Sequence, residues 1–271
     1  MLSWIFLELT TYAWFRRLIW KPIYQFLAKK FGSTTSWQFM NYGYSPKPDE
    51  QAISMPESEQ IHIYQLMLYH YLAVKTDIEG KDVLEVGSGR GGGSRYIAQY
   101  LKPKSMTGMD LASHAVDFSN RTHHSPNLKY IVGNAEKIPL PDACMDVVIN
   151  VESCHAYGSV DNFLAEVKRV LRPGGFLVLT DLRGQPGMEL LRSQLRRSGM
   201  DFMEEDDITE NVVEAIEKED DLKWKRIREG APKYLHAAIA EFGGAVGSQI
   251  HKQLKSKELI YFRFKLRKNT I

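Results

Sequence analysis

The 271-residue sequence predicts an α/β fold with a doubly wound, mostly parallel sheet. Between residues 82 and 180, short apolar runs typical of buried strands alternate with amphipathic stretches typical of helices. This alternation implies parallel strand pairs that are joined by right-handed helical crossovers. The composition, 44% hydrophobic and 25% charged, is that of a globular protein long enough to bury a core, which excludes a disordered chain and a disulfide-stapled miniprotein.

Each element has its own local signal, an apolar run for a strand or a helical period for a helix. Strands are predicted at residues 82–86, 106–110, 129–132, 146–150 and 176–180. Helices are predicted at residues 57–76, 91–101, 112–123 and 160–171, with a sharp turn at 172–175. Apolar and polar residues alternate at 259–266, after a turn-rich stretch at 243–247, which predicts a late antiparallel strand.

Residues 186–242 are strongly charged, and we predict that they form a mostly helical insertion before the end of the sheet. The acidic runs at 204–207 and 217–221 are interpreted as solvated helix faces, because such runs seldom have another role. We divide the chain into an N-terminal arm and cap, residues 1–58, and a main domain, residues 59–271.

The charge is unevenly distributed along the chain. Lys and Arg number 35 against 33 Asp and Glu, a net charge of +2 that gives no argument for a nucleic-acid partner. Residues 1–31, however, carry five basic residues against one acidic residue, and nine of the thirty aromatic residues. No run of ~18 uncharged residues is present, so a membrane-spanning helix is not expected. We predict that residues 1–31 form a helix that lies in a membrane interface or against an apolar acceptor. The alternative is that this helix packs on the main domain.

Two cysteines, Cys144 and Cys154, are too few for a disulfide framework and indicate a reducing, cytoplasmic compartment. Within that compartment, we expect the basic, aromatic arm to place the protein peripherally on a membrane surface. We expect Cys154 to be a packed thiol rather than a nucleophile. His123 and His124 have no carboxylate or thiol at ligand spacing, so no metal is expected.

A glycine-rich turn follows the first predicted strand. Gly87, Gly89 and Gly91 allow a tight turn between strand and helix and let a ligand approach the backbone. Gly87, Gly89 and Gly92 also fit the G-x-G-x-x-G fingerprint of dinucleotide-binding proteins, so that ligand remains open on the glycines alone. Asp110 ends the second strand, where an acid can bind both hydroxyls of a ribose. Glu85, two residues before the first glycine, would repel a pyrophosphate and favours a cationic ligand instead.

Together with residues 133–136 and 171–175, these motifs resemble the class I S-adenosylmethionine-dependent methyltransferases over residues 65–183. The resemblance implies a seven-stranded, Rossmann-like sheet and S-adenosyl-L-methionine as the cofactor. It implies cofactor contacts from Glu85, Gly87, Ser88, Gly89 and Gly91 at the methionine part, Asp110 at the ribose, Leu111, Asn134, Ala135 and Glu136 around the adenine, and Asn150 beside the sulfonium. The family more often has Asp at position 134, but an Asn side-chain oxygen can accept the same hydrogen bond.

His155 follows the fourth predicted strand and Asp181 ends the fifth, so the two are expected on the same rim of the sheet. A hydroxyl acceptor needs a base, usually His near neutral pH, and a carboxylate can orient that imidazole. Both positions match a catalytic pair used by several small-molecule O-methyltransferases of this fold, with capping and turn roles as the alternative. Tyr69 and His70 are expected either over the cofactor or in helix packing.

A narrower likeness covers residues 37–185. The runs at 39–44, 68–70 and 171–183, with Asn150-Val-Glu-Ser-Cys-His155, are similar to the phthiotriol/phenolphthiotriol dimycocerosates methyltransferases. That resemblance implies methyl transfer to a hydroxyl of a hydrophobic, lipid-like small molecule. Residues 186–242 match this family poorly, and we predict that they form a lid over the acceptor together with the N-terminal segment. The alternatives are C-methylation of a sterol or quinone, and a membrane-attached protein that binds the cofactor without catalysis.

Overall fold

The computed structural model describes residues 38–48, 50 and 53–270. The predicted N-terminal arm, residues 1–31, therefore lies outside the described residues. None of the helices in the described ranges has the length and the continuous apolar character that a membrane span requires.

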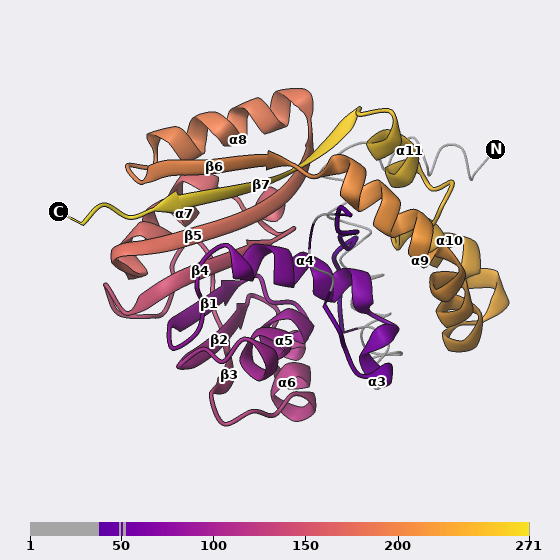
Figure 1. Ribbon diagram of the computed structural model, residues 1–271, viewed down its shortest axis with the longest axis horizontal. Coiled ribbons are helices and arrows are strands. Elements are labelled where there is room, and N and C mark those ends of the chain that lie inside the picture. Colours follow the sequence, from indigo (N-terminus) through magenta and orange to yellow (C-terminus); the bar gives the residue numbers. More distant parts are fainter. Residues whose placement is uncertain (1–37, 49, 51–52, 271) are drawn as a thin grey trace. The chain divides into compact units, whose positions relative to one another are not determined.

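The described residues form a seven-stranded sheet in the order β3-β2-β1-β4-β5-β7-β6 (Figure 1). The strands are β1 Asp82–Val86, β2 Ser105–Asp110, β3 Leu128–Val132, β4 Met145–Val151, β5 Leu171–Gly184, β6 Asp201–Asp207 and β7 Leu259–Arg267. β1 to β5 pair in parallel, and β7 is antiparallel to both β5 and β6. The doubly wound sheet, its five parallel strands and the late antiparallel strand are thus confirmed.

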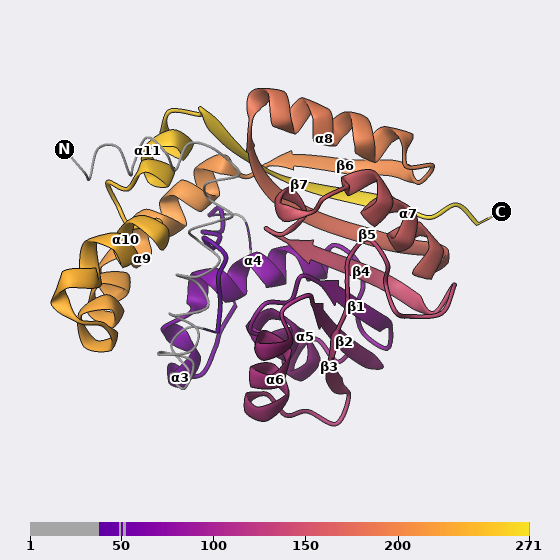
Figure 2. The same cartoon turned by 180° about the vertical axis from the view of Figure 1, so that it is seen from behind.

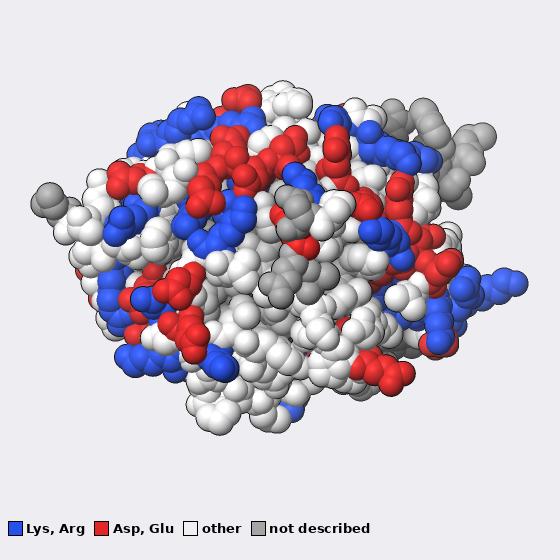
Figure 3. All heavy atoms as spheres, in the orientation of Figure 1, with Lys and Arg blue, Asp and Glu red and all other residues white. Residues whose placement is uncertain are grey.

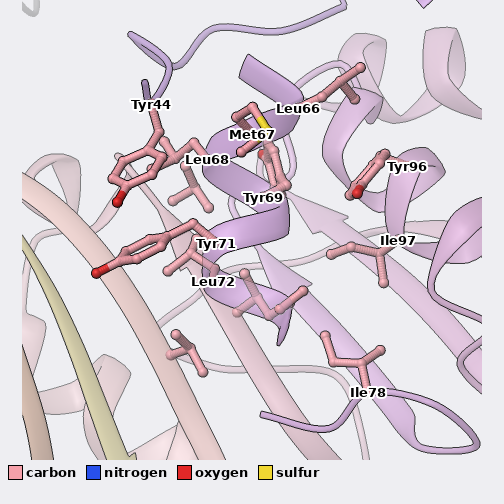
Figure 4. Packing of buried hydrophobic residues seen from close by; sticks show 14 of the residues in the cluster. Tyr44, Leu66, Met67, Leu68, Tyr69, Tyr71, Leu72, Ile78, Tyr96 and Ile97 are labelled. Carbon is pink, nitrogen blue, oxygen red and sulfur yellow. The ribbon is translucent and has the colours of Figure 1, made fainter. Parts of the chain in front are cut away.

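Helices cover both faces of the sheet. The helices are α3 Glu57–Gln60, α4 Ile63–Val74, α5 Gly92–Tyr100, α6 Ser113–Thr122, α7 Val160–Val170, α8 Gln185–Arg197, α9 Thr209–Gly230, α10 His236–Phe242 and α11 Gln249–Lys255, with short 3-10 turns η2 Cys154–Ala156 and η3 Lys233–Leu235. Apolar side chains of α4, α5 and α9 pack on one face, in the cluster that Figure 4 shows. Side chains of α7 and α8 pack on the other face; Figure 2 shows the molecule from behind, with both helices labelled.

One prediction was wrong: residues 201–207, expected to be helical, form strand β6. The acidic residues there pair across the ladder with basic residues of β7, as in the ion pairs of Arg263 with Glu204 and Asp206 and of Lys265 with Glu204. Basic and acidic side chains accordingly lie side by side over this part of the surface (Figure 3). Opposite charges on facing strands stabilise the pairing, so this strand needs no apolar alternation.

Two smaller differences concern boundaries. The helix predicted at 57–76 is interrupted after Gln60 and resumes at Ile63. The sharp turn predicted at 172–175 lies within β5, where Gly174 has a φ of 80° and the pairing with β4 shifts register.

Candidate active site

The residues singled out from the sequence lie along one side of the sheet, at the carboxyl ends of the parallel strands. Glu85 is the fourth residue of β1, Asp110 ends β2, Asn150 is next to last in β4, and Asp181 is in β5. In a doubly wound sheet the carboxyl ends of neighbouring parallel strands form the ligand site. The topology therefore brings these four side chains to a common edge.

The turn after β1 depends on its glycines. Gly87, Gly89 and Gly91 have φ values of 79°, 52° and 80°, which lie in the left-handed region that favours glycine. A Cβ atom on Gly87 would lie 2.4 Å from the Ser153 hydroxyl oxygen, and one on Gly91 would lie 2.6 Å from the Tyr130 ring. Side chains at these positions would collide with the loop after β4 and with β3, so the turn can pass this close only without them.

Glu85 lies fully buried beneath the glycine turn. The Tyr69 hydroxyl donates to its Oε1 at 2.7 Å, and the Ser94 hydroxyl donates to its Oε2. Burial raises the pKa of Glu85 to about 7, although both hydrogen bonds favour the charged form. Of the two residues left open on α4, Tyr69 thus lies at this site, whereas His70 forms a 2.9 Å hydrogen bond with the Tyr96 hydroxyl.

Asp110 holds the glycine turn in place. Its Oδ2 accepts from the Gly89 N–H and its Oδ1 from the Ala112 N–H, both at 2.8 Å. Each oxygen keeps a second lone pair that a ribose hydroxyl could use. Next to it, Leu111 has 73% of its surface exposed, which leaves an apolar side chain available to cover a flat ring.

The loop after β3 contains the predicted adenine contacts. The Asn134 Oδ1 accepts from the Glu136 N–H at 2.9 Å, so this oxygen already makes one hydrogen bond within the loop. Ala135 is buried, and the Glu136 Oε1 accepts from the Gly158 N–H at 2.9 Å. These contacts hold the loop after β3 against the loop after β4.

Asn150 leaves a buried polar atom unsatisfied at the same edge. Its side-chain nitrogen donates to the Val86 carbonyl at 2.8 Å and also contacts the Ser153 and Tyr157 hydroxyls. Its Oδ1 has no partner among the described residues, and neither has the buried Ser88 hydroxyl. Buried polar atoms normally have partners, so two such atoms beside a glycine turn fit a polar ligand. With the Asp110 carboxylate and the exposed apolar side chain of Leu111 nearby, these hydrogen-bonding groups fit S-adenosylmethionine, which has both charged and aromatic parts.

His155 and Asp181 meet across the ends of β4 and β5. The His155 Nδ1 lies 2.6 Å from the Asp181 Oδ1. The His155 side chain is 43% exposed, and that of Asp181 is fully buried. Partial burial lowers the pKa of His155, but the hydrogen bond and charge of Asp181 outweigh it and raise that pKa above 6.5. Burial raises the pKa of Asp181, but His155 and Arg183 reverse this and leave it below 3.8.

Neighbouring groups complete the environment of Asp181. The Arg183 guanidinium donates to its Oδ2 at 2.9 and 3.0 Å, and the Cys154 thiol does so at 3.1 Å. Cys154 is fully buried, and burial with the charge of Asp181 raises its pKa well above 9. The thiol is therefore protonated and packed, which does not suit a nucleophile.

His123 and His124 both bind backbone carbonyls, and the carbonyl that His123 binds belongs to Arg90, which lies within the glycine turn. His123 is buried at 2.9 Å from the Arg90 carbonyl, and His124 lies 3.1 Å from that of Arg121. Burial lowers the pKa of His123 to about 4. In the part of the chain that the structure describes, no group of three or more His, Cys, Asp or Glu side chains could hold a metal ion.

Sequence reasoning missed Glu152, which lies between β4 and His155. Its φ is 47°, a strained value for a residue other than glycine. The Glu152 Oε1 accepts from the Tyr261 hydroxyl at 2.7 Å and from the Tyr42 N–H at 2.9 Å. Burial raises the pKa of Glu152 to about 7. An acid three residues before a candidate base, at a strand end, was the available signal.

The family model described as "Methyltransferase domain" matches residues 84–179. The chain is 39% identical over 207 residues to a fatty-acid O-methyltransferase of Mycolicibacterium smegmatis, covering 76% of this chain and 75% of that one. It is 32% identical over 251 residues to a phthiotriol/phenolphthiotriol dimycocerosates methyltransferase of Mycobacterium leprae, covering 93% and 92%.

Solved structures share the fold at low sequence identity. The [4+2]-cyclase SpnF superposes with a TM-score of 0.70 at 18% identity and covers 92% of this chain and 96% of that one. The cyclopropane synthase MmaA2 from Mycobacterium tuberculosis has a TM-score of 0.67 at 15% identity, covering 89% and 97%.

Proposed function

The chain belongs to the class I S-adenosylmethionine-dependent methyltransferases, and from this we propose that it methylates a hydroxyl of a hydrophobic, lipid-like small molecule. S-adenosyl-L-methionine is the cofactor of this family. Two solved methyltransferase structures with a similar fold contain either this cofactor or S-adenosyl-L-homocysteine, the product that remains after methyl transfer. When bound, it supplies an electrophilic methyl group. The residues proposed to hold it are the glycine turn, Asp110, Leu111, residues 134–136 and Asn150.

The observation that carries the proposal is the His155–Asp181 pair. Because the Nδ1 of His155 is engaged with Asp181, its Nε2 is the nitrogen available to accept a proton. The buried Asp181 carboxylate keeps the imidazole in that tautomer and stabilises the imidazolium after the proton is taken. The acceptor hydroxyl thereby becomes a stronger nucleophile at the moment of transfer.

The named relatives support a lipid acceptor. By their names, one acts on a fatty acid and the other on phthiotriol or phenolphthiotriol dimycocerosates. A fatty acid is already a carboxylate at neutral pH and needs no base, whereas a hydroxyl does. A base with a buried carboxylate behind it therefore favours the hydroxyl.

The test is methyl transfer from labelled S-adenosylmethionine to three acceptors of equal chain length: an alkyl alcohol, an alkyl phenol and a fatty acid. We expect labelled ethers from the alcohol or the phenol. Label in the fatty acid alone would contradict the hydroxyl acceptor. Label on carbon when a sterol or quinone is offered would favour C-methylation, and cofactor binding without any labelled product would favour a binding protein.

We further propose that the basic, aromatic residues 1–31 contact a membrane surface or the acceptor. Within the predicted lid, residues 186–242 of the 59–271 methyltransferase domain, α8 packs on the sheet and β6 belongs to it, so we propose that the helical residues 209–242 cover the acceptor. We propose a cytoplasmic protein that is peripheral on a membrane surface. Deletion of residues 1–31 is expected to reduce co-sedimentation with anionic vesicles and turnover of lipid acceptors more than cofactor binding. Equal loss of all three would mean that the arm is part of the fold.

A further inference from the structure

Residues 38–45 pass over the carboxyl ends of the parallel strands, where the candidate site lies. A Cβ atom on Gly92, at the start of α5, would lie 2.7 Å from the Gln38 carbonyl oxygen. A Cβ atom on Gly89 would lie 3.6 Å from the Met40 sulfur. The segment therefore lies directly on the glycine turn that serves the cofactor.

The far end of this segment is bound to two helices. The Tyr44 N–H donates to the Tyr64 carbonyl of α4 at 2.9 Å. Ser45 and Asn211 of α9 exchange two hydrogen bonds, of 3.1 Å from the Ser45 N–H and 2.8 Å from the Asn211 side chain. The indigo segment can be followed beside α4 in Figure 1.

Between these ends, one bond joins the segment to the end of β4. The Tyr42 N–H donates to the Glu152 Oε1 at 2.9 Å, across 110 positions of sequence. The same oxygen accepts from the Tyr261 hydroxyl of β7, which is fully buried. Glu152, which follows β4, thus links residues 38–45 to β7 through a single carboxylate oxygen. Its backbone is strained, and the 3.0 Å bond from its N–H to the Thr180 carbonyl helps to hold it there.

We propose that Glu152 is a positioning residue, which fastens residues 38–45 over the glycine turn and places a negative charge beside His155. The anchoring part of this inference stands without the proposed function, whereas the effect on a catalytic base rests on it. Because the anchor closes the segment on the cofactor turn, it contributes to cofactor affinity. Because Glu152 and His155 lie three positions apart in the loop that follows β4, the negative charge of Glu152 favours the imidazolium form of His155.

The charges around both groups support this. The charge of Glu152 raises the pKa of His155, and that of His155 lowers the pKa of Glu152. His155 is also faced by Asp181 and Arg183 from β5. Glu152 is also faced by Asp181 from β5, by Tyr42 from the segment and by Tyr261 from β7, and its charge acts on Lys223 of α9.

The experiment compares Glu152→Gln with Glu152→Ala in the full-length protein. The Gln amide oxygen can still accept from the Tyr42 N–H and the Tyr261 hydroxyl, but the charge is gone. Calorimetry with S-adenosylhomocysteine measures the anchor. NMR titration of labelled histidines, with His155→Gln for assignment, measures the charge without any acceptor.

For Glu152→Gln we expect wild-type affinity for S-adenosylhomocysteine and a His155 titration at lower pH than in the wild type. For Glu152→Ala we expect an affinity about tenfold weaker, since the hydrogen bonds from the Tyr42 N–H and the Tyr261 hydroxyl are both lost. If His155 titrates at the wild-type pH in Glu152→Gln, or if Glu152→Ala binds like the wild type, the inference is overturned.

Two further variants keep the test decisive. If Glu152→Ala does not fold, Tyr261→Phe removes one of the two donors and is expected to weaken binding severalfold; unchanged binding would overturn the anchor. Glu210→Gln removes the same charge from an exposed carboxylate of α9 that pairs with Lys257. Both readouts are expected to stay at wild-type values in Glu210→Gln, and a matching shift there would overturn a local effect of Glu152.

Discussion

The imidazole of His155 and the carboxylate of Asp181 lie 2.6 Å apart, Nδ1 to Oδ1, although 26 positions separate them in the sequence. The parallel pairing of β4 with β5 aligns Asn150 with Leu179 and Val151 with Thr180. Asp181, the next residue of β5, therefore lies level with the loop that follows β4 and carries His155. The carboxylate is fully buried and the imidazole half exposed. The contact fixes the Nδ1 of His155 and leaves Nε2 as the nitrogen that can accept a proton.

Substitution of the base tests its role most directly. His155→Gln is expected to lower turnover of a hydroxyl acceptor by a factor of about 100 or more, the usual contribution of a general base. Binding of S-adenosylhomocysteine, measured by calorimetry, should not change. In the wild type, kcat/KM should rise with pH through the raised pKa of His155, because only neutral imidazole accepts a proton. A profile without an acidic limb would contradict the assignment.

Asp181→Asn tests the partner of the base. Asp181 raises the pKa of His155, so its neutralisation should move the acidic limb of kcat/KM to lower pH. The plateau rate should fall, because the imidazolium loses its counter-ion. The substitution also leaves the Arg183 guanidinium without its carboxylate, so the melting temperature is measured in parallel. An acidic limb at the wild-type pH in a folded variant would show that Asp181 does not act on His155.

Asp110→Ala tests the cofactor site. The substitution removes the acceptor for the Gly89 and Ala112 N–H groups together with the proposed ribose contact. We expect affinity for S-adenosylhomocysteine to fall at least tenfold, since charged hydrogen bonds contribute about 1.5–3 kcal/mol each. Asp117→Ala, an exposed position on neighbouring α6, is the matched control and should bind like the wild type. Equal affinities for both variants would exclude Asp110 from the site.

The sequence was sufficient where local patterns determine structure. The apolar run of β1 and the three glycines after it predicted a strand followed by a turn, and all three glycines have positive φ. Strand ends also predicted that His155 and Asp181 would share a rim, because parallel pairing leaves little choice of position. Each of these inferences needed only residues close in sequence and the rules of parallel sheets.

The sequence was insufficient where distant residues determine structure. β6 has an acidic rather than an alternating pattern, and it is stabilised by Arg263 and Lys265, about 60 positions away. Glu152 gains its surroundings from Tyr42 and Tyr261, 110 and 109 positions away in opposite directions. A local pattern carries no information on such partners, so both features required the structure.

Glu85→Gln tests the buried acid under the glycine turn through stability. Burial raises the pKa of Glu85 from 4.5 to about 7 in the folded protein. A raised folded pKa means that stability is fully present below pH 4.5 and is lost as pH rises through 7. A pKa difference of about 2.5 corresponds to about 3 kcal/mol, most of it lost between pH 5 and pH 8.

Gln can keep the hydrogen bond from Tyr69 and carries no charge, so the variant should lack this loss. Urea unfolding without cofactor at pH 5 and pH 8 measures the difference between wild type and variant. We expect Glu85→Gln to gain roughly 2–3 kcal/mol relative to the wild type over that range. Glu152, whose pKa is raised in the same way, is present in both proteins and cancels in the comparison. If the difference in the free energy of unfolding between the two proteins were the same at pH 5 and pH 8, burial would not raise the pKa of Glu85.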